Sequence, residues 1–410
     1  MVKLQKSWKY RLLFPLRVWL FSRLVICIAM LNFAPLLPAP PGGIAATVGW
    51  DVFAAWDSDF YEKIATFGYN NPHSVAFFPL YPLLVRGVVA LGLPFVVAGT
   101  LVNNLAFLAA LIFIYNWAAS SYSQNVARWT VVVLALFPLS IFGTVIYSEG
   151  LYLLLSSVAL RAFEQKRYRW VVLGGALATF TRPTAMALIP AFLIVSWRER
   201  RGEVAYFASL ATGLGIFCYS LYCQIYFQDA LAFIRVQKAW QPAQDFFGQD
   251  WLKMVMQVAV GTRNWQRGTI VDVWHPLIFL VICVSSYLLW KSDFKLRGYG
   301  LCFSAFVLWL VAGNPLINSA IAFGGIYLLW YFRFSLSNTL ITYGVCSYAL
   351  IFSTGRATSA ERYVYGIVTV AVSLGILLSR YPRYGYIVSA FFALLLILYS
   401  LRFAQHLWVA

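Results

Sequence analysis

Long apolar runs, repeated along the chain and separated by short basic or polar segments, most strongly limit how this sequence can fold. With 61% of its 410 residues hydrophobic, the chain has more apolar surface than a soluble domain buries. A bilayer accepts such runs as helices, because a helix satisfies its backbone hydrogen bonds within one segment. We therefore predict an all-α polytopic integral membrane protein with about 11 to 13 transmembrane helices. The predicted spans are residues 16–37, 96–117, 129–146, 150–163, 170–181, 183–197, 204–226, 274–290, 299–313, 315–332, 336–353, 362–379 and 385–402.

The net charge of +17 is distributed as membrane topology requires. The basic residues form short clusters between apolar runs, which is typical of cytoplasmic loops and argues against a nucleic-acid partner. This pattern places the N-terminus in the cytoplasm and two long segments, 38–77 and 227–273, on the opposite side. Ten of the 14 acidic residues then lie outside or at the outer boundary. The membrane would be the plasma membrane of a bacterium or the endoplasmic reticulum membrane of a eukaryote.

A single integral membrane domain, residues 1–410, is the simplest organisation, because no internal repeat or low-complexity linker divides the chain. Residues 78–93 form either a short span or a helix that lies in the interface, and charge placement favours the interface. We assign the first outer loop, 38–77, to catalysis. The second outer segment, 227–273, contains Trp240, Trp251 and Trp265, with Trp274 directly after it, and is our candidate for acceptor binding.

The first outer loop concentrates acidic residues among aromatic ones. Asp51, Asp57, Asp59 and Glu62 fall within twelve residues, beside Trp56 and other large rings. A carboxylate at a membrane boundary is partly desolvated, which raises its pKa and makes it a usable base toward a hydroxyl group. Aromatic faces beside carboxylates also suit sugar binding. The alternatives are ordinary solvated loop charges and an interfacial aromatic belt.

Four segments together resemble the PIG-V-like mannosyltransferases, relatives of GPI mannosyltransferase II in the GT-C class of glycosyltransferases. They are WDSDFYEKIATFGY, HSVAFFPLYPLLVR, NNLAF and LFPLSIFGTVIYSEGLYLLL, in this order and spacing, and a weaker similarity follows at ATSAERYVYGI. The resemblance implies a GT-C-type fold with interfacial helices in the first outer loop. It also implies a polyprenyl-phosphate-linked hexose donor, an outer or lumenal active site and inversion at the anomeric carbon.

The resemblance further implies that an acidic residue of the first outer loop is the catalytic base. Asp57 matches that position. Many relatives carry a small or polar residue where this chain has Asp59, so Asp59 stays an alternative base. On a helix Asp57 and Tyr61 share a face and Asp59 points elsewhere. Asp59, Tyr61 and His73 lie in the matched segments and are candidate substrate contacts.

Displacement of a phosphate also needs groups that bind the leaving oxygens. Arginine binds phosphate with two parallel hydrogen bonds, and Arg182 and Arg362 lie at predicted outer turns. The alternative for both is a helix-end arginine that extends to lipid headgroups. Glu149 interrupts a long apolar stretch. It could orient the acceptor, pair with an arginine, or hold a divalent cation together with Asp57.

No cofactor is required by these patterns, although a divalent cation stays open. The three histidines are far apart in sequence, and the glycine-rich motifs of nucleotide folds are absent. The resemblance implies a membrane hexosyltransferase, mannose being the first choice of sugar, with a polyprenyl-phosphate donor and a glycan, glycolipid or protein acceptor. The alternative is a transporter or flippase of a lipid-linked sugar, which would favour acidic residues within spans, paired broken helices and repeat symmetry.

Overall fold

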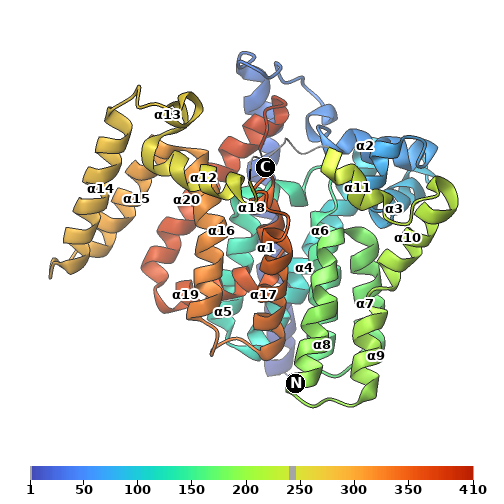
Figure 1. Ribbon diagram of the computed structural model, residues 1–410. Helices are drawn as coiled ribbons and strands as arrows, with labels where there is room; N and C mark the ends of the chain where they lie inside the picture. The colour runs from blue at the N-terminus through green and yellow to red at the C-terminus, as the bar shows by residue number, and fades with distance from the viewer. Residues whose placement is uncertain (1, 240–245, 410) are drawn as a thin grey trace. The chain divides into compact units, whose positions relative to one another are not determined.

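The computed structural model describes residues 2–239 and 246–409, with side chains for 11–237 and 246–409. Every regular element in these ranges is a helix (Figure 1), so the all-α prediction is confirmed. The α-helices are α1 Val2–Cys27, α2 Asp57–Phe67, α3 Leu80–Val89, α4 Phe95–Ser121, α5 Gln124–Leu136, α6 Glu149–Glu164, α7 Tyr168–Thr181, α8 Leu188–Arg198, α9 Glu203–Ala211, α10 Leu214–Phe227, α11 Ala232–Ala239, α12 Gln249–Val260, α13 Thr262–Arg267, α14 Trp274–Lys291, α15 Arg297–Ala312, α16 Asn314–Tyr331, α17 Asn338–Phe352, α18 Ala360–Tyr365, α19 Val368–Arg380 and α20 Pro382–Ala404.

Four helices of the described chain are long and apolar enough to cross a membrane, or five if the bent pair α9 and α10 is one span. They are Arg11–Leu36, Phe95–Ser121, Trp274–Lys291 and Pro382–Ala404. Five shorter apolar helices accompany them; four lie where the sequence predicted full spans, and Leu80–Val89 lies in the predicted interfacial stretch. Short 3₁₀ turns interrupt apolar runs, as at Pro138–Gly143 (η5) after α5 and Pro183–Ala187 (η6) before α8. The chain is therefore an integral membrane protein, and the number of 11 to 13 crossings stays a prediction.

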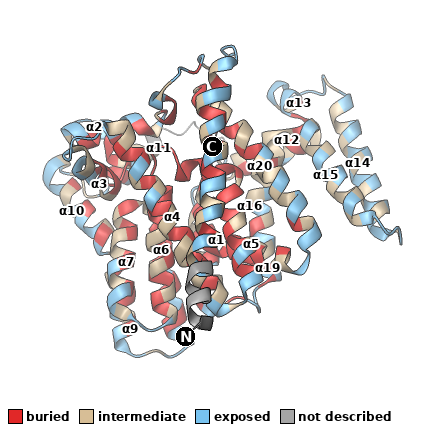
Figure 2. Ribbon diagram, turned by 180° about the vertical axis from the view of Figure 1, so that it is seen from behind, coloured by how far each residue is buried: buried red, intermediate tan, exposed pale blue. Residues whose placement is uncertain are grey.

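The described chain divides into two compact units, and the single-domain organisation predicted from the sequence stays a prediction. The first unit contains residues 1–242, 328–347 and 365–410. Its centre is formed by α1, α4, α5, α6, α7, α19 and α20, which carry most of the buried side chains (Figure 2). Small residues let these helices approach closely: a Cβ on Gly215 of α10 would meet α7 backbone, and one on Gly375 of α19 would meet Thr130 of α5.

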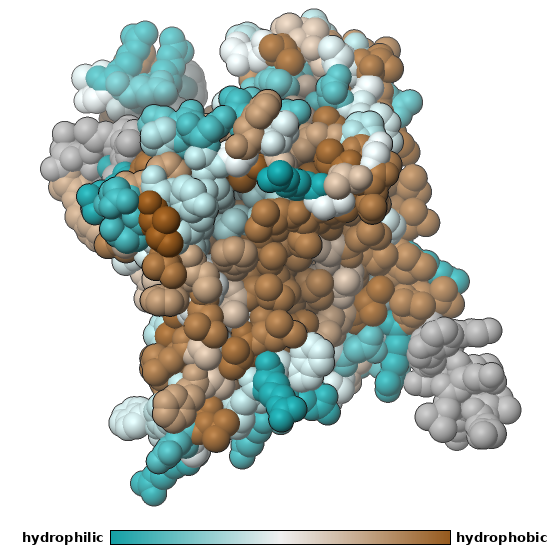
Figure 3. Space-filling model, turned by 90° about the vertical axis from the view of Figure 1, so that its right-hand side faces the viewer, coloured by the Kyte–Doolittle hydropathy of each residue, from teal (hydrophilic) through white to brown (hydrophobic). Residues whose placement is uncertain are grey.

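An apolar band covers the face of the first unit shown in Figure 3, with hydrophilic residues above and below it. Exposed apolar side chains of α7, α9 and α10 contribute to that surface, among them Leu173, Phe207, Phe217 and Leu221. In water such a patch would be costly, but hydrocarbon chains solvate it at no cost. This distribution agrees with a membrane environment for the first unit.

The second unit contains residues 243–327 and 348–364. The ring of Trp251 lies 4.3 Å from that of Phe352, and Asn264 closes the turn before α14 through bonds to Val271 and Asp272. His275 contacts the Val258 carbonyl oxygen at 3.1 Å. Helix α14 has no buried residue, as expected of a span surrounded by lipid.

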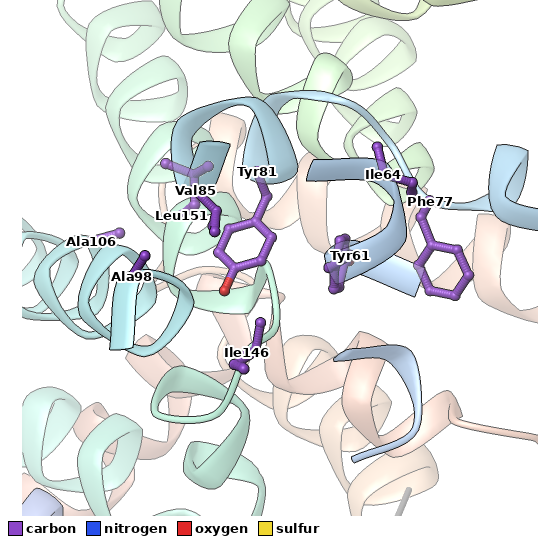
Figure 4. Packing of buried hydrophobic residues seen from close by; sticks show 9 residues of the cluster. All are labelled: Tyr61, Ile64, Phe77, Tyr81, Val85, Ala98, Ala106, Ile146 and Leu151. Atoms are coloured by element: carbon purple, nitrogen blue, oxygen red, sulfur yellow. The ribbon is translucent and has the colours of Figure 1, made fainter. Parts of the chain in front are cut away.

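The first outer loop folds into three short elements: the 3₁₀ turn Trp50–Phe53 (η3), α2 and the 3₁₀ turn Pro72–Ala76 (η4); α3 follows the loop. They pack around a buried cluster that Figure 4 shows, with Tyr61 and Tyr81 at its centre. Helix α3 has 10 residues, about 15 Å at 1.5 Å per residue, against roughly 30 Å of hydrocarbon. It is too short to cross, in agreement with the interfacial placement predicted for 78–93.

Candidate active site

Asp57 is the first residue of α2 and is half-buried. The residue before it, Trp56, has a φ of 60°, a left-handed conformation that costs a residue with a side chain about 1–2 kcal/mol. Bonds on both sides hold this turn: the Ala55 N–H donates to Ser58 Oγ at 3.2 Å, and the Asp57 N–H donates to Tyr147 Oη at 3.4 Å. The start of α2 is thus attached to the segment that precedes α6.

That segment, residues 144–148, is irregular and buried, and Asn103 of α4 holds it. The Asn103 amide nitrogen donates to the carbonyl oxygens of Phe142 and Val145, both at 2.7 Å. Its amide oxygen accepts the N–H of Gly150 at 3.0 Å. Any Cβ at Gly150 would lie 2.6 Å from that oxygen, which explains the glycine after Glu149.

Glu149 begins α6, is 3% exposed, and forms an ion pair with Arg182. Arg182 ends α7 at the turn before Pro183, and its guanidinium also donates to Ser148 Oγ at 3.4 Å. Of the roles left open for Glu149, pairing with an arginine is therefore confirmed.

Tyr61 lies one helical turn after Asp57 and joins the two parts of the site. Its hydroxyl group is 3.1 Å from Ser148 Oγ, and its ring packs edge-on against Tyr81 at 4.9 Å. Burial raises the pKa of Tyr61 well above its usual value, against the opposing charge of Arg182. The charges of Glu149 and Asp57 also act on this hydroxyl group. Asp57, Tyr61, Glu149 and Arg182 therefore form one cluster within the first unit.

The remaining predicted site residues are Asp59, His73 and Arg362. Asp59 is exposed on α2, on another face than Asp57, as the helical spacing predicted. His73 is exposed in η4, where its N–H bonds to Asn71 Oδ1 at 2.9 Å. Arg362 belongs to α18 in the second unit, 9% exposed, with its guanidinium 5.8 Å from the Tyr363 ring centre. The substrate contacts assigned to these three residues stay predictions.

Beside Arg362, Glu361 is a buried carboxyl that sequence reasoning assigned no role. Burial raises its pKa to about 7, opposed by its own backbone N–H and by Arg362. It lies in the short helix α18, outside the candidate spans. Glu361 therefore binds or releases a proton near neutral pH.

The second outer segment, 227–273, is divided between the two units, and its residues 240–245, with Trp240, lie outside the described residues. In the first unit, α11 packs on η4 of the first outer loop. Phe233 of α11 contacts Phe78 and Tyr219, at ring distances of 5.4 and 5.8 Å. This end of the segment is therefore placed against the loop that carries Asp57. Acceptor binding by 227–273 stays a prediction.

A divalent cation would find two carboxylates near this cluster, Asp57 and Glu149, and Glu149 is already paired. In the described parts of the chain, no three His, Cys, Asp or Glu side chains gather as ligands. Magnesium bound by one or two carboxylates takes its other ligands from water and substrate phosphate. A divalent cation held by Asp57 and Glu149 therefore stays a prediction.

Sequence reasoning missed three side chains that build the cluster: Ser58, Tyr147 and Ser148. All three are buried. Tyr147 and Ser148 belong to the run YSEG, directly before Glu149. Their polar groups within an otherwise apolar stretch were the sequence feature that could have indicated a role in the site. It also missed Trp408 at the other end of the chain, whose ring lies 5.3 Å from that of Trp56. Nothing local in the sequence links these two tryptophans.

Comparison with known proteins places this cluster in a family. A family model described as mannosyltransferase (PIG-V) matches residues 8–234, which is more than half of the chain and contains Asp57, Tyr61, Glu149 and Arg182. The chain belongs to the PIG-V mannosyltransferase family. The recognition made from the sequence motifs is thereby confirmed.

Individual relatives match shorter parts of this PIG-V family chain. GPI mannosyltransferase 2 of Drosophila pseudoobscura pseudoobscura is 29% identical over 135 residues, 30% of each protein. GPI alpha-1,6-mannosyltransferase 2 of Homo sapiens is 26% identical over 170 residues, 38% of this chain and 34% of the relative. The matched region thus spans about a third of these curated relatives. Among solved structures, the Archaeoglobus fulgidus oligosaccharyltransferase in the apo form is similar over 96% of this chain and 55% of that protein, with a TM-score of 0.46 and 12% identity.

Proposed function

We propose that the protein transfers mannose, or a related hexose, from a polyprenyl-phosphate-linked donor to an acceptor hydroxyl group on the non-cytoplasmic face of the membrane. Membership of the PIG-V family supports the reaction class. The observation that carries the assignment to residues is the cluster itself. The Asp57 backbone N–H donates to Tyr147, and Tyr61, one helical turn later, contacts Ser148. The guanidinium of Arg182, which is paired with Glu149, donates to the same Ser148 hydroxyl group.

In the proposed reaction, the Asp57 carboxylate accepts the proton of the acceptor hydroxyl group as its oxygen attacks the anomeric carbon. A new carbon–oxygen bond forms while the bond between the anomeric carbon and the phosphate oxygen breaks. The prenyl phosphate leaves with the electron pair, and the sugar configuration inverts because attack and departure occur on opposite faces. One displacement therefore accounts for all atoms and charges.

Arg182 is the residue proposed to bind the leaving phosphate. Its pairing with Glu149 fixes the guanidinium, and a fixed cation loses less entropy and reorganises less as negative charge develops. A guanidinium group binds phosphate oxygens through parallel N–H donors, which is the role proposed for Arg182. Tyr61 is proposed to keep the α2 and α6 ends of the cluster in register through Ser148.

The acceptor is a glycan, a glycolipid or a protein hydroxyl group, and the bilayer is the route by which the lipid carrier enters. A transporter of lipid-linked sugars would need paired broken helices. The described residues contain one bent pair, α9 and α10 at 42°, and Asp57 lies on neither helix. Transfer is therefore favoured over transport.

The test is transfer by purified protein in lipid nanodiscs, with synthetic polyprenyl-phosphate mannose compared against a nucleotide-linked mannose, and a panel of alkyl glycosides as acceptors. We expect product from the lipid donor only. Asp57→Asn should lower the rate by at least about 10³-fold, because the base is lost with the shape kept. Asp59→Asn is the matched control on the same helix and should retain most activity. Full turnover by Asp57→Asn would reject Asp57 as the base, and exclusive use of the nucleotide donor would reject the donor class.

A further inference from the structure

The C-terminal residues 402–409 fold back onto the first outer loop, far from them in sequence. The Gln405 side-chain amide donates to the Pro38 carbonyl oxygen at 3.1 Å, and the Ile44 N–H donates to the Gln405 carbonyl oxygen at 2.9 Å. Gly43 lies so close that a Cβ there would be 2.6 Å from the same oxygen. Figure 1 shows the end of α20 beside the segment that follows α1. The C-terminal residues are thus a built part of this loop.

This attachment places Trp408 against Trp56, the residue directly before Asp57. The two rings meet edge to face, 5.3 Å apart at 85°. Trp408 is held by its own turn: Arg402 donates to the Trp408 carbonyl oxygen at 2.8 Å, and the turn passes through His406 at a φ of 56°. Both tryptophans are ordered by bonds to the neighbouring backbone yet remain 40% and 48% exposed.

Trp56 and Trp408 are held in place and yet exposed to solvent, and Trp56 directly precedes the candidate base, Asp57. Their edge-to-face packing leaves ring faces uncovered, and Trp56 is held in a costly backbone conformation. A hexose ring has an apolar face of C–H groups that packs on an aromatic face while its hydroxyl groups stay in contact with water. Tryptophan suits that ligand because one end of its side chain is apolar and its N–H group can remain wet.

We propose that Trp56 and Trp408 form a binding platform for a hexose ring next to Asp57, so that the C-terminal residues contribute directly to substrate binding. This rests on the proposed transfer of a hexose. The ring belongs either to the donor or to a sugar of the acceptor, since both must meet at the base. In either case the chain's last helix and its first outer loop form one substrate surface within the first unit.

The test measures sugar binding and transfer separately. Saturation-transfer NMR in nanodiscs, with methyl α-mannoside as the probe, reports binding without any donor. The kinetic arm determines KM for polyprenyl-phosphate mannose and for an alkyl mannoside acceptor. Trp408→Leu should raise one of these KM values about tenfold, with kcat within about twofold, and weaken the NMR signal. Trp408→Phe should retain much of the binding, since an aromatic face is kept.

The matched control is Trp197→Leu, which removes an exposed tryptophan in the last turn of α8. A raised KM for the donor assigns the platform to the donor hexose, and a raised KM for the acceptor assigns it to the acceptor sugar. Equal losses in Trp408→Leu and Trp197→Leu would instead mean membrane anchoring and overturn the platform. So would unchanged mannoside binding in Trp408→Leu. If wild-type protein binds mannoside but transfers nothing from the lipid donor, the donor proposal fails while the platform stands.

Discussion

Arg182 and Glu149 show how one residue pair can serve both folding and chemistry. Their charges are 11% and 3% exposed, so each would be costly without the other. From the sequence, an arginine at a helix end and an acid in an apolar stretch were separate candidates with several roles open. The structure brings the two residues together, because the first residue of α6 lies in space beside Arg182 at the end of α7. Ser148, directly before Glu149, contacts the Tyr61 hydroxyl group.

Removing the charge of either Arg182 or Glu149 alone should therefore lower the thermal stability of the protein. Removing both charges together should leave most of that stability. We expect Arg182→Met to destabilise the protein by about 3–5 kcal/mol, since Glu149 stays buried and charged. The double variant Arg182→Met, Glu149→Gln should recover most of the thermal stability and yet remain at least about 100-fold slower in transfer, because the phosphate ligand is missing. Differential scanning fluorimetry and the transfer assay measure these separately. Recovery of transfer in the double variant would reduce the pair to a structural role.

At the level of elements, apolar periodicity predicted the helices far better than it predicted their interruptions. The run 204–226 is two helices that bend, and 129–146 is a helix followed by the 3₁₀ turn η5 and an irregular segment. Apolar composition alone cannot show such breaks, because side chains on another helix satisfy the backbone groups that a break frees. Here Asn103 of α4 does so for residues 142–150. The candidate site lies at this break.

Asn103→Leu tests whether that bonding positions the site. The change leaves two carbonyl oxygens and one N–H group without their partner, at about 1–3 kcal/mol for each buried group. We expect a clear loss of thermal stability and a lower kcat, because the segment that carries Ser148 and Glu149 loosens. Asn116→Leu is the control on the same helix, since the Asn116 side chain donates to the Ile112 carbonyl oxygen of its own helix. Equal effects of the two variants would contradict a positioning role for Asn103.

For the whole molecule, composition predicted the class correctly: an all-helical integral membrane protein. What composition could not predict is which distant segments meet. Trp408 joins Trp56, and Arg201 at the basic turn after α8 bonds to the Phe163 carbonyl oxygen at 2.6 Å and to Glu199. Such contacts depend on how helices pack in three dimensions, which one sequence does not encode locally. The residues within each motif could be identified from the sequence because each motif is a short continuous run.

The two ends of α6 predict how the first unit is oriented in the membrane. This helix carries Glu149 at one end and leads to Lys166 beyond the other, about 24 Å away for 16 residues. The acidic cluster and the basic turns therefore lie at opposite ends of the first unit, with the apolar band of Figure 3 between them. Because basic turns face the cytoplasm, Asp57 should face the other side. In a variant without native cysteines, Asp59→Cys should react with a membrane-impermeant maleimide in intact cells or sealed lumen-out vesicles, and Lys166→Cys only after permeabilisation. The reverse pattern would place the proposed base in the cytoplasm and exclude transfer on the outer face.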